Sequence, residues 1–155
     1  MYDKCVKLLE ERGVTLQDIV GLVFFLQGKY HPEILEDEIM LAVKSVIAKR
    51  EVQHAIMTGI LIDKIAESKI EMDEQLRTIL MNDESLYGID EVLAYGICNL
   101  YGSIALTNYG YIDREKPGIL EKINQHSAQC NVFLDDIVGA IAASAASKIA
   151  HSHGK

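Results

Sequence analysis

Apolar residues recur at spacings of three and four along most of the chain, whereas the strict alternation of a half-buried strand is absent over any useful length. The first pattern places apolar side chains on one face of an α-helix, so its dominance predicts an all-α protein. Only Pro32 and Pro117 interrupt it. At 155 residues we expect a single helical domain over 1–155, large enough to form a core without disulfides.

Turn and capping residues divide the first half of the chain into five predicted helices. Thr15 followed by Asp18 is typical of a capped helix start, and Asp73 is a second candidate cap. No helix breaker lies between the third and fourth helices, so one continuous rod is an alternative there. The predicted helices lie at 3–11, 15–28, 33–50 and 51–67, and a short one begins at Asp73.

Two segments rich in Gly and Ala follow, at 87–106 and 132–151. A helix that is apolar on all sides is buried, so we expect 87–106 at the centre of a multi-helix bundle, surrounded by the other helices. Its glycines, Gly88, Gly96 and Gly102, would let neighbouring helices approach closely. Between the two segments, 107–117 is a predicted polar loop, and Asn131 is the predicted cap of the last helix.

Charge and composition exclude several functions. The formal net charge is −8 and the densest basic stretch is only Lys49-Arg50, which disfavours nucleic acids and anionic membranes as partners. No apolar run is long enough to span a membrane, and the N-terminus lacks a signal-peptide pattern. Cys5, Cys98 and Cys130 are far apart, which is typical of reduced, buried thiols. We therefore expect a soluble cytoplasmic protein.

A pair of adjacent carboxylates, Asp135 and Asp136, opens the last helix, and only apolar and small residues follow until Lys148. One interpretation is that both acids complement the positive end of the helix dipole from solvent. Adjacent residues lie about 100° apart on a helix, however, so one acid should face inward if the helix is central. A buried carboxylate needs a hydrogen-bonding partner or a cation. Both interpretations stay open at this point.

The same pattern appears in Asp90-Glu91, at the start of the other Gly-rich segment. A further acid, Asp113, is followed three residues later by Lys116. Hard oxygen ligands gathered in one place suit Mg²⁺ or Mn²⁺ rather than zinc. Carboxylates that hold such an ion, with a cationic side chain beside them, suit the chemistry of phosphate esters.

These acidic motifs resemble those of the phosphatidylglycerophosphatase A superfamily, in which an aspartate precedes Lys-Pro and an Asp-Asp pair opens a helix of small residues. The matching segments are 113–117 and 134–139, with Asp90-Glu91 similar to an upstream Asp-Glu motif, and the resemblance extends over about 87–146. Over the whole chain, the sequence looks most similar to the branch of YutG-like and low-temperature-requirement C proteins. That branch has an all-helical fold with one helix surrounded by the others.

The resemblance implies a Mg²⁺-dependent hydrolase that removes the terminal phosphate of phosphatidylglycerophosphate. It further implies that Lys116 contacts the phosphate and that Asp135 and Asp136 act with it as catalytic residues. The substrate would be a small phosphorylated compound, such as a phospholipid headgroup, and we expect a homo-oligomer. The residues implied to hold the metal and activate water are Asp90, Glu91, Asp113, Asp135 and Asp136.

The sequence also departs from the family. Gly110 stands where an arginine is expected before the loop aspartate, and Gly118-Ile119 replaces an expected Trp-Pro. These changes leave the carboxylates in place but remove features linked to phospholipid recognition. A non-catalytic metal- or ligand-binding regulatory module is therefore one alternative. A purely structural helical oligomer, with its carboxylates paired to Lys or Arg, is another.

Overall fold

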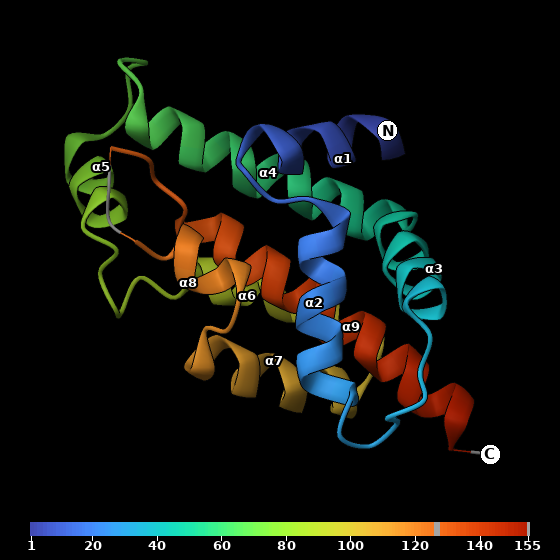
Figure 1. The fold of residues 1–155 in the computed structure, drawn as a ribbon. Coiled ribbons are helices and arrows are strands. Elements are labelled where there is room, and N and C mark those ends of the chain that lie inside the picture. Colours follow the sequence, from blue (N-terminus) through green and yellow to red (C-terminus); the bar gives the residue numbers. More distant parts are fainter. Residues whose placement is uncertain (126–127, 155) are drawn as a thin grey trace.

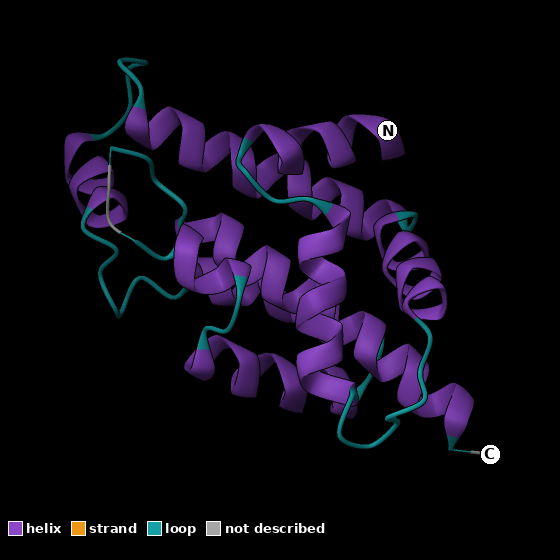
Figure 2. Cartoon of the chain, in the orientation of Figure 1, coloured by secondary structure: helices purple, strands orange, loops and turns teal. Residues whose placement is uncertain are grey.

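Figure 1 shows the fold in a computed structural model, which describes residues 1–125 and 128–154. Within these residues the chain forms nine α-helices and no strand (Figure 2), which confirms the all-α prediction. The helices are α1 (Tyr2–Glu11), α2 (Leu16–Gln27), α3 (Glu36–Ile47), α4 (Arg50–Glu67), α5 (Glu74–Met81), α6 (Ile89–Cys98), α7 (Ser103–Glu115), α8 (Ile119–Ile123) and α9 (Val132–His153).

The last helix, α9, crosses the middle of the molecule (Figure 1) and contacts α2, α3, α4, α6, α7 and α8. Every residue from Val132 to Ser147 is buried. The helix is rich in Ala and Gly, and its small side chains let the surrounding helices approach closely. The predicted architecture, a Gly- and Ala-rich helix surrounded by the others, is therefore confirmed.

The predicted position of that central helix was wrong. The segment 87–106 does not form one buried helix: α6 and α7 divide it at a turn, where Gly102 adopts a positive φ of 92°. Both helices flank α9, and α6 exposes Val92 at 62% and Tyr95 at 45%. The apolar residues of 87–106 therefore form two surfaces. One packs against α9, and the other, on α6, is exposed to solvent.

The predicted polar loop at 107–117 was also wrong, because α7 continues to Glu115. Tyr109 and Ile112 are buried and their side chains lie next to Gly139 of α9, which stabilises a helix in spite of the Asn and Gly residues nearby. The helix ends where Lys116 turns to a φ of 48°, since the following Pro117 disfavours helical backbone before it. Asp113 thus lies on the last turn of a helix.

The first half of the chain follows the predicted helices closely. Thr15 and Asp18 form the expected capping box, and Asp73 accepts a hydrogen bond from the amide of Leu76. The third and fourth helices are separate, because the backbone leaves the helical conformation at Lys49. The three cysteines are free and buried, as predicted. None of the described helices is both long and apolar enough to cross a membrane.

The three glycines expected to permit close helix contacts do not lie at such contacts. Gly88 and Gly102 have positive φ angles at helix starts, and Gly96 faces open space. The close contact occurs instead at Gly59 of α4. A Cβ atom there would lie 2.3 Å from Ile137 Cδ1 and 3.0 Å from Phe133 Cβ of α9.

Replacing Gly59 with valine should therefore force α4 away from α9 and destabilise the fold by about 1–3 kcal/mol. The matched control is Gly110→Ala on α7, where a new Cβ meets nothing within 4 Å. The control should be neutral or stabilising by up to about 1 kcal/mol, because alanine favours a helix. Urea unfolding measures both, and equal effects of the two substitutions would contradict this packing.

Candidate metal centre

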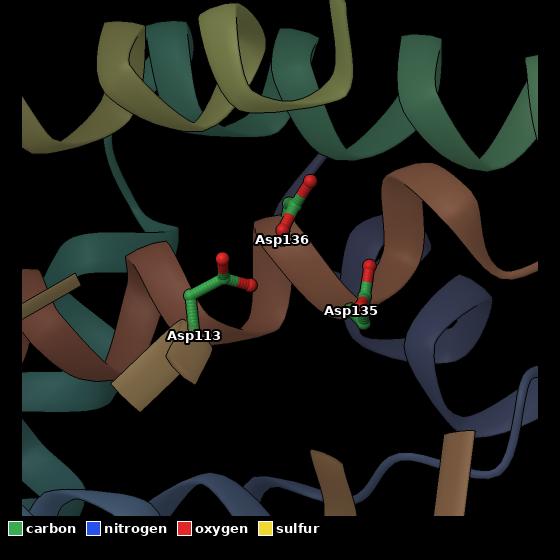
Figure 3. Close-up of side chains that lie close together, drawn as sticks. All are labelled: Asp113, Asp135 and Asp136. Carbon is green, nitrogen blue, oxygen red and sulfur yellow. The ribbon is translucent and has the colours of Figure 1, made fainter. Parts of the chain in front are cut away.

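Three aspartates distant in sequence meet where α7 ends and α9 begins. Asp113 comes from the last turn of α7, while Asp135 and Asp136 lie in the first two turns of α9. One carboxylate oxygen from each lies within 4.8 Å of the others. Figure 3 shows the carboxylate of Asp113 directed toward the part of α9 that carries the other two.

Burial decides between the two interpretations of the Asp-Asp pair. Asp135 is 8% exposed and Asp136 is 4% exposed, so neither acts on the helix dipole from solvent. Both remain buried because α9 is covered on all sides. Such carboxylates need compensation from a proton, a cationic side chain or a metal ion.

Among the residues that the structure describes, this cluster contains one cationic side chain, Lys116. The Lys116 ammonium donates to Oδ1 of Asp113 and to Oδ2 of Asp135, at 2.7 Å in each case. Burial alone would lower the pKa of Lys116, but the two carboxylates outweigh burial and raise it. Lys116 therefore carries a positive charge and bridges α7 to α9.

This single positive charge does not balance the cluster. Burial raises the pKa of Asp136, and the neighbouring carboxylates of Asp135, Asp90 and Asp113 raise it further. Burial also raises the pKa of Asp135, although Lys116 acts in the opposite direction. Glu91 shows a raised pKa from burial and from the charges of Asp90 and Asp113. Burial and mutual repulsion therefore favour the protonated forms of Asp135, Asp136 and Glu91, and a further positive charge would favour their ionised forms.

The cluster lines a pocket with a volume of about 150 Å³. All six residues singled out from the sequence line it, which brings the predicted site residues together at one place. Five further residues were not predicted as site residues, including Asp83, whose charge contributes to the raised pKa of Asp135. The lining residues are Asp83, Glu84, Ser85, Gly88, Asp90, Glu91, Asp113, Lys116, Asn124, Asp135 and Asp136.

The start of α9 is fixed by a carboxylate that the sequence did not single out. Asp63, fully buried on α4, accepts hydrogen bonds from the amides of Phe133 at 3.0 Å and Leu134 at 2.9 Å. Burial raises the pKa of Asp63 to about 7, while the two amides favour its ionised form. Asp63 performs the capping predicted for Asn131, whose side chain instead donates to the carbonyl of Ile123.

Arg12 of the segment after α1 completes this support. Its guanidinium forms two hydrogen bonds with the carboxylate of Glu67, and it also donates to the carbonyl of Cys130 and to the side chain of Asn131. Glu67 in turn accepts from the amide of Cys130 at 2.6 Å. The chain entering α9 is thus tied to α4, and the Asp-Asp pair follows within one turn.

The donor set fits a hard divalent cation. All candidate ligand atoms are carboxylate oxygens, which suit Mg²⁺ or Mn²⁺ and are poor ligands for softer metals. Asp113, Asp135 and Asp136 offer three such oxygens, and Asp90 and Glu91 lie beside them. The excess negative charge around Lys116 is the electrostatic condition under which a divalent cation binds.

This arrangement defines a class of protein: an all-α domain with a buried carboxylate cluster on its central helix. Comparison with models of known protein families agrees with the resemblance found in the motifs. The model of the phosphatidylglycerophosphatase A family matches residues 8–151 of this chain. The chain therefore belongs to the phosphatidylglycerophosphatase A family.

Individual relatives cover nearly the whole chain. The uncharacterized protein YutG of Bacillus subtilis (strain 168) is 60% identical over 152 residues, which are 97% of this chain and 91% of that protein. The crystal structure of the low temperature requirement C protein from Listeria monocytogenes has 54% identity and a TM-score of 0.95, and the match covers 99% of this chain and 97% of that one. The structure of a protein of unknown function from Bacillus stearothermophilus has 55% identity and a TM-score of 0.94. The match covers 98% of this chain and 94% of that one.

Asp63→Ala should cost about 2–4 kcal/mol of folding stability, because two buried amides lose their acceptor. The control is Asp73→Ala, which removes an exposed cap on α5 and should cost about 1 kcal/mol. Chemical denaturation compares the two. Equal losses would show that the start of α9 does not depend on Asp63.

The raised pKa values of Asp135 and Asp136 predict a pH dependence of the metal-free protein. Below about pH 4 these groups are protonated in both the folded and unfolded chain, so their contribution to stability is fully present. As the pH rises, the unfolded chain releases these protons first, and stability falls until the native pair has released its own. Asp136→Asn removes this loss and should raise the melting temperature at pH 8 but not at pH 4.

Thermal unfolding in the presence of a chelator tests this dependence. Each unit of pKa shift corresponds to about 1.4 kcal/mol, so the difference between variant and wild type should be measurable at pH 8. A stabilisation by Asp136→Asn that is the same at both pH values would contradict the assignment of raised pKa values to this pair.

Proposed function

We propose that the protein is a metal-dependent phosphatase that acts on a phosphate monoester, with Mg²⁺ or Mn²⁺ as its cofactor. The observation that carries the proposal is the convergence of Asp113, Asp135 and Asp136 with one cation, Lys116, in a polar pocket. Membership of the phosphatidylglycerophosphatase A family supports the same reaction class. A phospholipid headgroup is the substrate that the family's name suggests.

In this proposal Asp113, Asp135 and Asp136 hold the metal, and Asp90 and Glu91 complete its surroundings. A bound divalent cation supplies positive charge to the phosphate oxygens and lowers the pKa of a water. Lys116 then contacts the phosphate, since an ammonium is a good partner for a phosphate oxygen. The rigid start of α9 keeps the Asp-Asp pair in place, so little reorganisation is needed when charge develops on the phosphate.

Asp136 and Asp90 have a further role in this scheme. Burial and the neighbouring carboxylates raise the pKa of Asp136, which favours a proton on this carboxyl when no metal is bound. Asp136 would have to be ionised to act as a metal ligand. Asp90, outside the three proposed ligands, would accept a proton from the attacking water.

The second candidate function is a binding or regulatory module without turnover. Its support is the pair of sequence departures at Gly110 and Gly118-Ile119, which flank the site residues Asp113 and Lys116. Gly110 and Gly118 are exposed, so no arginine or aromatic side chain adds to the pocket at these positions. Such a module would still hold a metal through the same carboxylates.

Purified protein should bind one divalent ion per chain and hydrolyse members of a broad phosphate-ester panel only when Mg²⁺ or Mn²⁺ is present. Asp135→Asn and Asp136→Asn should each lower turnover by about 100-fold or more, because each removes a charge from the metal site. Lys116→Met should lower turnover while metal binding persists. Asp37→Asn on the exposed start of α3 is the matched control and should behave as wild type.

Calorimetry and phosphate release measure binding and turnover separately. Metal binding without release of phosphate from any ester would favour the regulatory module. Absence of both would contradict the proposal, as would turnover that survives both Asp→Asn substitutions.

A further inference from the structure

A tyrosine hydroxyl without a hydrogen-bonding partner lies beside the carboxylate cluster. Tyr109 of α7 is 1% exposed, and no atom of the described residues accepts a hydrogen bond of ordinary geometry from its hydroxyl. A buried polar group without a partner destabilises a fold, and a phenylalanine would fill the same space without this penalty. Packing therefore accounts for the ring of Tyr109 but not for its hydroxyl.

Contacts with two different helices fix the ring of Tyr109. The ring lies against α9 at Gly139, since a Cβ atom on that glycine would lie 3.8 Å from its Cδ2 and Cε2 atoms. Tyr95 of α6 packs against the same ring edge to face, with the ring centroids 5.4 Å apart and the ring planes at 87°. A ring held in this way has little freedom to turn, so its hydroxyl has a defined position.

Asp136 is the carboxylate that affects this hydroxyl most strongly. Burial raises the pKa of Tyr109, and the charge of Asp136 raises it further, so the hydroxyl keeps its proton and remains a donor. Asp113 and Asp135 act in the same direction but less strongly. Asp136 precedes Gly139 by three residues, which places both on one face of α9, the face that the ring covers. The hydroxyl is thus close to Asp136, although no hydrogen bond of ordinary geometry joins the two.

Asp136 also lacks the cationic partner that the other two aspartates of the cluster share. Lys116 donates to Asp113 and to Asp135, and no ion pair within the described residues reaches Asp136. Solvent does not orient this carboxylate either, because Asp136 is almost completely buried. A metal ligand in this position therefore needs a donor from the protein, and the hydroxyl of Tyr109 is a nearby donor that has no other partner.

We propose that Tyr109 is a positioning residue, whose hydroxyl donates a hydrogen bond to the Asp136 carboxylate and thereby orients Asp136 as a metal ligand. This inference rests on the metal binding of the proposed function, but it does not depend on turnover. Carboxylates that bind a metal are themselves hydrogen-bonded by residues outside the ligand set, and these bonds fix their orientation. The hydroxyl of Tyr109 thereby gains the partner that it otherwise lacks.

Titration calorimetry with Mn²⁺ tests the role of the hydroxyl without any substrate. Tyr109→Phe keeps the ring and removes only the hydroxyl, and it should lower the affinity for Mn²⁺ about 10–100-fold. The matched control is Tyr101→Phe, which removes another buried hydroxyl that lacks a partner in the described part of the chain. Lys49 lies over the ring of Tyr101, and the carboxylate that acts on its hydroxyl is Glu51, outside the pocket. This control should bind Mn²⁺ as wild type does.

Three further measurements separate positioning from a purely structural role. The electron paramagnetic resonance spectrum of bound Mn²⁺, recorded with protein in excess, depends on the symmetry of its ligands, so Tyr109→Phe should change it and Tyr101→Phe should not. In the presence of a chelator, Tyr109→Phe should melt at the same temperature as wild type or higher, because it removes a buried group without a partner. In a crystal soaked in Mn²⁺, the Tyr109 hydroxyl should lie about 2.5–2.7 Å from an oxygen of Asp136.

Four outcomes would overturn the inference. A Tyr109→Phe variant with the Mn²⁺ affinity and spectrum of wild type would do so and leave the proposed metal site intact. Equal losses of affinity in both tyrosine variants would show that the effect is not specific to this hydroxyl. A lower melting temperature of Tyr109→Phe in the chelator would assign the hydroxyl to folding instead. If wild type itself does not bind Mn²⁺, the metal site of the proposed function is wrong, and this inference fails with it.

Discussion

The two hydrogen bonds from the amides of Phe133 and Leu134 to Asp63 determine where the central helix begins. They satisfy backbone donors that are buried at the start of α9 and have no partner within the helix. Once the helix begins there, Asp135 and Asp136 are carried into the core by the geometry of its first turns. The negative charge of the site is thus a consequence of where the buried helix α9 starts. Arg12 and Glu67 also hold the residues that lead into α9, since Arg12 pairs with Glu67 and Glu67 accepts a hydrogen bond from the amide of Cys130.

The sequence was sufficient for the fold class and for the acidic motifs. Periodicity predicted the helices, and the Gly- and Ala-rich composition predicted one central apolar helix, although the prediction placed it at 87–106 and the structure places it at α9. It was not sufficient for the position of 87–117. There Tyr109 and Ile112 stabilise α7 through contacts with α9, so burial overrides the loop-forming tendency of neighbouring Asn and Gly residues.

The residues that support the site, such as Asp63, could not be predicted from the sequence, because their roles depend on contacts between distant segments of the chain. Asp63 is separated from Phe133 by 70 residues, and nothing about a single acid on an apolar helix indicates which amides it caps. Asp83 was not singled out, because it lies in the polar stretch 82–85 and belongs to no recognisable motif. The carboxylates found in advance share one property, since each belongs to a local motif with Lys-Pro or with a second acid.

The central claim is that Asp113, Asp135 and Asp136 together hold one divalent cation. A crystal soaked in Mn²⁺ and measured for anomalous scattering tests this claim most directly. The account predicts a single strong peak between the ends of α7 and α9, within coordination distance of about 2.0–2.3 Å from oxygens of these aspartates. A crystal in which the peak is absent from this cluster, while Lys116 still bridges Asp113 and Asp135, would contradict it.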